Sequence, residues 1–367
     1  MQVVRVIVAV AGGALVLVTV LSVTRTLIIP RARRGMVARV VARGVDGAFQ
    51  FLVRRVRSYE ERDQLLAGQA AGFLLALLAT WLLGFYLGFA LLLWPQTHDA
   101  GIAFRESASS LFTLGFVAPN SGGTTALDAI EAAAGLIVVA LQIAYLPTLY
   151  AAFNRRETEV TLLDARAGSP PWGPELLART RYGMRTRTDD LPAFYSLWER
   201  WAADVAESHA NYPVLLRFRS PQPLSSWLVG LLAVLDSAAL YLALCPSQER
   251  YEVRMAVRMG FTALRQIGSA VGLPVNVDPD PDQPLALSYD DYLAGVQRLL
   301  DVGFPVERTA EQAWPHFRGW RVNYESLAYA IAYRIDAVPA LWSGPRRWTS
   351  EPIPPRRPAT RVASDAR

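Results

Sequence analysis

The chemistry that this sequence could perform centres on one short run, Thr113-Leu114-Gly115-Phe116-Val117. A cation that has lost its water needs oxygen atoms around it, and a row of backbone carbonyls can provide them. Such a backbone needs positive φ at alternate positions, which glycine adopts cheaply and β-branched residues resist. Gly115 meets this requirement at one position, and Val117 fails it at the next. Thr113 could add a carbonyl and a hydroxyl at the inner mouth of such a path.

The segments on either side of this run are long and apolar. Val3–Ile29, Leu65–Trp94 and Leu127–Phe153 each exceed the roughly 20 residues that a helix needs to cross a bilayer. The chain is 52% hydrophobic with a mean hydropathy of +0.20, which is typical of a protein that is part membrane and part soluble. A short half-buried helix is expected over Arg105–Phe112, directly before the run. The sequence therefore predicts a re-entrant loop between the second and third spans.

The placement of arginine predicts the direction of the spans. All 37 basic residues are arginine. Nine of them lie between the first two spans, at Arg31, Arg33, Arg34, Arg39, Arg43, Arg54, Arg55, Arg57 and Arg62. Short loops rich in arginine stay in the cytoplasm, so the N-terminus is expected outside and the third span returns inward. We therefore expect a multi-pass protein of the cell membrane whose C-terminal domain is cytoplasmic.

The basic segment between these spans has an apolar stripe at helical spacing. The stripe consists of Val37, Val41, Val45, Phe49, Leu52 and Val56. A basic amphipathic helix of this kind typically lies on an anionic membrane surface. The alternative is an ordinary solvated helix packed on its neighbours, and the sequence leaves both open.

The region from Phe104 to Tyr150 resembles the pore loop and inner helix of potassium-channel-type proteins, in the bacterial form with two helices and a single pore loop. Their filters read T-x-G-[YF]-G, and Val117 stands where the second filter glycine belongs. The resemblance covers a small part of the chain. It implies passive permeation of a monovalent cation, K⁺, through a pore formed by about four chains. The alternative is a non-conducting membrane scaffold or sensor that keeps the pore-domain fold while its C-terminal domain binds a partner or ligand.

Four further residues could support the loop or line an inner cavity. Glu131 lies near the start of the third span, where a carboxylate favours the helix N-terminus or serves a functional role, with Arg105 as a candidate partner. Gln142 and Thr148 could line an inner cavity or bond to a neighbouring helix. Gly135 could act as a hinge, or allow close helix packing.

The composition divides the chain into five segments, and we expect an all-α fold. They are an N-terminal transmembrane helix (1–30), the basic amphipathic segment (31–64), a pore-domain-like module (65–154), a cytoplasmic helical domain (155–342) and a disordered Pro/Arg-rich tail (343–367). Residues 224–244 are also long enough to span. A span there would place Asp236 near mid-bilayer at a cost of roughly 2.5–3.5 kcal/mol, so we favour a buried central helix.

The sequence offers little for enzyme chemistry. It has neither a G-x-G-x-x-G fingerprint nor a P-loop, and Cys245 has no partner that suggests a nucleophile. The alternating Asp278, Asp280 and Asp282 lack the glycine and glutamate of a calcium loop. We expect no enzyme activity, no cofactor, no metal beyond a permeating K⁺ and no nucleic-acid partner.

Overall fold

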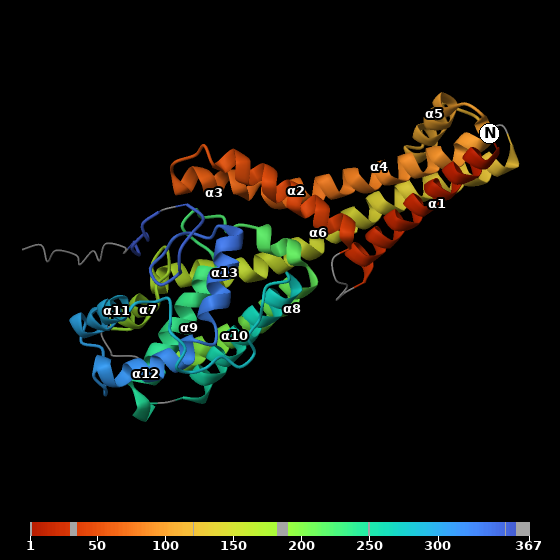
Figure 1. Ribbon diagram of the computed structural model, residues 1–367. Coiled ribbons are helices and arrows are strands. Elements are labelled where there is room, and N and C mark those ends of the chain that lie inside the picture. Colours follow the sequence, from red (N-terminus) through yellow and green to blue (C-terminus); the bar gives the residue numbers. More distant parts are fainter. Residues whose placement is uncertain are drawn as a thin grey trace, which may run out of the picture. The chain divides into compact units, whose positions relative to one another are not determined.

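The computed structural model describes residues 2–29, 35–119, 121–181, 190–248, 250–348 and 350–356 (Figure 1). These residues form helices and loops, with two isolated β-bridges and no strand among them, which confirms the predicted all-α class. The chain divides into two compact units. Unit 1 is Met1–Arg57 with Leu65–Ala151, and unit 2 is Ser58–Gln64 with Ala152–Arg367.

Long apolar helices dominate unit 1. Its elements are α1 (Gln2–Val23), the π-helical turn η1 (Thr24–Ile28), α2 (Met36–Val53), α4 (Gln69–Thr97), α5 (Ala100–Leu111) and the first part of α6 (Gly122–Ala167). Over the described residues, four helices are long and apolar enough to cross a membrane: Gln2–Ile28, Tyr59–Thr97, Gly122–Ala167 and Trp227–Leu244. The first three cover the three predicted spans, except that the first ends at Ile28, one residue before the expected Ile29, and the fourth lies in unit 2.

Small residues bring α1 and α4 close together, and the two helices lie side by side in Figure 1. A Cβ added to Gly12 would lie 2.6 Å from the carbonyl oxygen of Gly88, and one added to Gly84 would lie 2.5 Å from Thr19 Oγ1. Trp81 Nε1 donates a hydrogen bond to Ser22 Oγ at 3.0 Å. Small residues that allow close backbone approach are the usual basis of helix packing in membranes.

Helix α2 packs one face along the first turns of α4. Phe49 lies against Gly72, where an added Cβ would be 3.2 Å from the ring, and Gln69 Nε2 donates to Asp46 Oδ1 at 2.8 Å. These contacts fit a helix packed on its neighbours, one of the two alternatives from the sequence, although they leave the other face of α2 exposed. Arg31, Arg33 and Arg34 lie outside the described residues.

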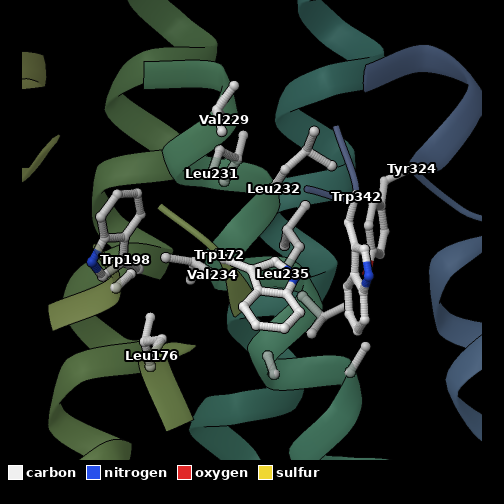
Figure 2. Close-up of a cluster of buried hydrophobic side chains, with 14 of the residues drawn as sticks. Trp172, Leu176, Trp198, Val229, Leu231, Leu232, Val234, Leu235, Tyr324 and Trp342 are labelled. Carbon is white, nitrogen blue, oxygen red and sulfur yellow. The ribbon is translucent and has the colours of Figure 1, made fainter. Parts of the chain in front are cut away.

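Unit 2 surrounds one apolar helix, α9 (Trp227–Leu244), whose 18 residues are all buried. The elements around it are the start of α3 (Tyr59–Ala67), the end of α6, α7 (Gly173–Arg179), α8 (Leu191–Asn211), η2 (Pro213–Arg217), η3 (Pro246–Gln248), α10 (Tyr251–Ala270), α11 (Tyr289–Asp301), α12 (Ala310–Arg321) and α13 (Glu325–Ile335). Figure 2 shows Trp172, Trp198 and Trp342 among the leucines of α9. No face of α9 is left open to lipid, as expected for a buried central helix.

Asp236 is tolerated inside α9 because it is paired. The Arg321 guanidinium donates to its carboxylate, and the Tyr324 hydroxyl donates to Oδ1 at 2.8 Å. Arg321 is itself fully buried and also donates to Glu325 Oε1 at 2.9 Å. A buried charge persists in a protein interior when it is paired and hydrogen-bonded in this way.

The segment after Trp342 differs from the disorder expected of its composition. Arg346 is buried and donates to the carbonyls of Ala337 and Val338 at 2.6 and 2.9 Å. The Trp348 ring stacks on Tyr59 with a centroid separation of 6.0 Å. A prediction from composition assumes that arginine side chains are solvated. Here backbone carbonyls bind the Arg346 guanidinium inside unit 2. Residues 357–367 of the expected tail lie outside the described residues.

Candidate functional site

The candidate site is the turn from α5 to α6, and Asp99 sets where α5 begins. Helix α4 ends at Thr97, and His98 reverses the chain with φ of 63°. The Asp99 carboxylate then accepts from the Ile102 backbone N–H at 3.0 Å, which caps the helix. Because of this cap, α5 starts at Ala100, five residues before the expected start at Arg105.

The predicted filter run folds back over the last turn of α5. The backbone N–H groups of Leu114 and Gly115 donate to the Ser109 carbonyl at 2.8 and 3.4 Å. The Val117 N–H donates to Ser109 Oγ at 3.2 Å. A helix end leaves its last carbonyls without intrahelical partners, and the run satisfies two of them here, those of Ser109 and, through the Thr113 N–H at 3.0 Å, Ser110. Ser109 therefore holds the run against α5.

Two alternate residues of the run have positive φ. Thr113 has φ of 54° and Gly115 has φ of 69°, whereas the φ of Val117 lies outside this region. A Cβ added to Gly115 would meet nothing within 4 Å, so backbone conformation rather than space favours glycine there. Thr113 is β-branched and strained at positive φ. Positive φ at alternate residues, as expected of a carbonyl-lined path, is thus present at Thr113 and Gly115 and absent at Val117.

Most apolar side chains in the run, and that of Phe112 directly before it, are exposed. Phe112, Leu114 and Phe116 each expose more than half of their surface in the single chain. Thr113 is exposed too, and its hydroxyl donates to the Phe112 carbonyl at 2.8 Å. One chain by itself therefore does not enclose this loop.

Behind the loop, the partner of Glu131 is Ser107 and not Arg105. Glu131 is fully buried, and its Oε1 lies 2.5 Å from Ser107 Oγ. Arg105 is exposed. Two residues on a helix are separated by about 200°, so Arg105 faces away from the side of α5 on which Ser107 meets α6. The candidate pairing of Arg105 with Glu131 is wrong for this reason.

Two more acidic residues join Glu131, and the sequence reasoning missed both. Glu106 on α5 is fully buried, and Asp128 on α6 is half-buried. Both interact electrostatically with Glu131. Within the described part of the chain, neither carboxylate oxygen of Glu106 has a hydrogen-bond donor, and no cluster of acidic, His or Cys residues could hold a metal ion. The three-residue spacing of Asp128 and Glu131 places both on one helix face, and this spacing could have predicted that Asp128 lies beside Glu131.

The remaining candidates lie along α6. Gly135 allows α6 to approach the end of α5, because an added Cβ would lie 2.5 Å from the Leu111 carbonyl oxygen. This contact fits close packing. Gln142 is buried, and its Oε1 has no partner among the described residues, whereas Thr148 is exposed. Glu131, Gly135 and Gln142 therefore lie on a buried face of α6, and Thr148 lies on an exposed face.

No family model, no curated protein and no solved structure matches this chain. What can be inferred about its function therefore depends on the residues and geometry of the α5–α6 turn.

Proposed function

We propose that the chain forms a cation pore, in which about four copies bring their loops together and K⁺ passes passively along Thr113 to Val117. The observation that carries this proposal is the pair of positive φ angles at Thr113 and Gly115, directly after α5 and before α6. Filters of this type are built from four loops whose carbonyls replace the water of the ion. A single loop per chain then requires an oligomer, which would also cover Leu114 and Phe116.

Electrostatics favour a cation over an anion at this place. The C-terminal end of α5 carries the negative end of the helix dipole and points into the run. Arg105 is the basic residue of α5, and its exposed side chain points away from the α6-facing side of the helix, so it does not oppose this dipole.

The proposed topology has three spans with the N-terminus outside and unit 2 in the cytoplasm. The arginines between the first two spans support this direction. The complete burial of α9 supports counting three spans rather than four, because a spanning helix at the surface of a unit would expose apolar residues to lipid.

The test is K⁺ flux into liposomes that contain the purified full chain. Wild-type protein is expected to pass K⁺. Gly115→Ala forces a Cβ into the left-handed region at about 1–2 kcal/mol, so we expect a roughly tenfold loss of flux. Gly122→Ala is the matched control, because its Cβ also meets open space but its φ is ordinary. Equal flux in both variants would contradict the filter role of Gly115.

A non-conducting scaffold or sensor is the second candidate, and Val117 favours it. Its φ lies outside the positive region, and its N–H is bonded back to Ser109. In this alternative the wild type passes no K⁺. Val117→Gly then restores flux, because glycine can adopt positive φ at this third alternate position. If neither protein conducts, the pore proposal itself is overturned.

A further inference from the structure

Helix α2 has an exposed apolar stripe opposite the face that packs on α4. Met36, Val40 and Phe51 are 70%, 56% and 58% exposed. Their spacing of four and eleven residues places them on one side of the helix. Ala38 and Ala42 are buried on the other side. Asp46, bonded to Gln69, fixes the rotation of the helix, so the stripe faces outward.

Arginines follow the edge of this stripe. Arg39 and Arg43 are exposed one turn apart beside Met36 and Val40, with Arg43 Nε donating to the Arg39 carbonyl at 3.4 Å. Residues 36–57 contain five arginines against one acidic residue, Asp46. The surface that α2 presents is therefore apolar along its centre and positively charged along its edge.

The first turns of α2 lie beside the end of a candidate membrane span. A Cβ added to Gly35, the residue before α2, would lie 3.9 Å from Ser22 Oγ on α1. The candidate span Gln2–Ile28 ends within two turns of Ser22. Lipid headgroups lie where a span leaves the hydrocarbon core, and long basic side chains reach them there.

We propose that this exposed face of α2 binds the headgroup of an anionic phospholipid. Arg39 and Arg43 contact the phosphate, for which the planar guanidinium is well suited, and Met36 and Val40 contact the upper acyl chain. A lipid fits better than a protein partner because charge and apolar surface continue from the end of a membrane span. This site is independent of whether the chain conducts.

The test measures lipid binding to the full chain in detergent by native mass spectrometry, comparing phosphatidylglycerol with phosphatidylcholine. Wild type is expected to bind phosphatidylglycerol more tightly, and less so as salt is raised. Each arginine removed is expected to weaken that binding about fivefold, so Arg39→Gln/Arg43→Gln together lose roughly twenty-five-fold. The control is Arg200→Gln/Arg258→Gln, which removes two exposed arginines of unit 2 and should change nothing.

Met36→Ser/Val40→Ser is a second variant that keeps both charges. It is expected to weaken binding of both lipids while phosphatidylglycerol remains preferred. Unchanged phosphatidylglycerol binding in Arg39→Gln/Arg43→Gln would overturn the proposal, as would an equal loss in the control pair. A change in the number of associated chains without a change in bound lipid would assign the face to a second copy and overturn it too. Because the experiment measures lipid binding and not K⁺ flux, a negative result contradicts the lipid site without bearing on the proposed pore.

Discussion

Ser107 carries one hydroxyl proton but has two oxygen acceptors within reach. Its Oγ lies 2.9 Å from the Tyr86 carbonyl and 2.5 Å from Glu131 Oε1. A single proton cannot serve both acceptors. Both bonds are complete if a protonated Glu131 donates to Ser107 while Ser107 donates to Tyr86. The hydrogen-bond geometry therefore indicates a neutral Glu131.

Replacement of Glu131 tests this arrangement. Glu131→Gln keeps a donor for Ser107 and should change the free energy of unfolding by less than about 1 kcal/mol. Glu131→Ala leaves a buried hydroxyl without its partner and should cost about 1–3 kcal/mol. Circular dichroism melting in detergent measures both. A Gln variant as unstable as the Ala variant would show that Glu131 needs its negative charge.

His209 in unit 2 makes stability depend on pH. It is fully buried, and Arg156 Nη1 lies 2.9 Å from its Nε2. Because arginine can only donate, Nε2 accepts and the ring is neutral. Burial and the Arg156 charge hold the pKa of His209 well below its usual range.

We expect unit 2 to lose stability as pH falls below about 6.5. In that window the unfolded chain takes up a proton on His209 and the folded chain does not, so acid favours unfolding. The melting temperature between pH 7.5 and 5.5 measures this effect, and His209→Gln should flatten the dependence. His316→Gln, which alters an exposed histidine, is the control. An unchanged slope in His209→Gln would contradict the assignment.

At the scale of elements, the contact of α1 with α4 is sensitive to a single methyl group. A Cβ on Gly12 would lie 2.6 Å from the Gly88 carbonyl oxygen, whereas a Cβ on Gly13 would have its nearest neighbour at 3.9 Å. Gly12→Ala should therefore destabilise unit 1 by about 1–3 kcal/mol through overpacking. Gly13→Ala should be neutral or slightly stabilising, since alanine favours helix. Circular dichroism melting of the two variants compares them directly, and equal effects would mean that the helices are not in this register.

Elements formed by local apolar runs were predictable, and features that depend on distant partners were not. The apolar stretches that predicted three spans recur in α1, α4 and α6. The burial of Asp236 depends on Arg321, 85 residues away, so no local pattern contains it. Glu106 lies within the helix expected over Arg105–Phe112, but its burial beside Asp128 and Glu131 depends on α6, so no local pattern contains it. The expected helix start at Arg105 missed the cap at Asp99, because the cap depends on the reversal of the chain at His98.

At the scale of the whole molecule, the single cysteine simplifies a test of topology. Cys245 is buried, its Sγ donates to the Pro305 carbonyl at 3.0 Å, and burial raises the pKa of the thiol to about 12. The thiolate is the reactive form, so Cys245 should not react with maleimide at neutral pH in the folded protein. Cysteines introduced at exposed positions can therefore be labelled selectively.

We expect Gln266→Cys, on the exposed side of α10, to resist an impermeant maleimide in intact cells and to react after permeabilisation. Thr125→Cys, exposed at the start of α6, should react in intact cells because the loop is proposed to lie outside. Labelling of Gln266→Cys in intact cells would place unit 2 on the outer side and reverse the topology.

The aromatic residues packed around α9 also decide what an optical experiment can detect. Eight of the ten tryptophans belong to unit 2, and only Trp81 and Trp94 belong to unit 1. Intrinsic fluorescence will therefore follow the loosening of the helices around α9 and will contain little signal from the helices proposed to conduct. Replacing both Trp81 and Trp94 with phenylalanine would make the emission specific to unit 2. Fluorescence would then report the unfolding of unit 2, and total helicity would report the unfolding of both units, so that the two could be followed separately.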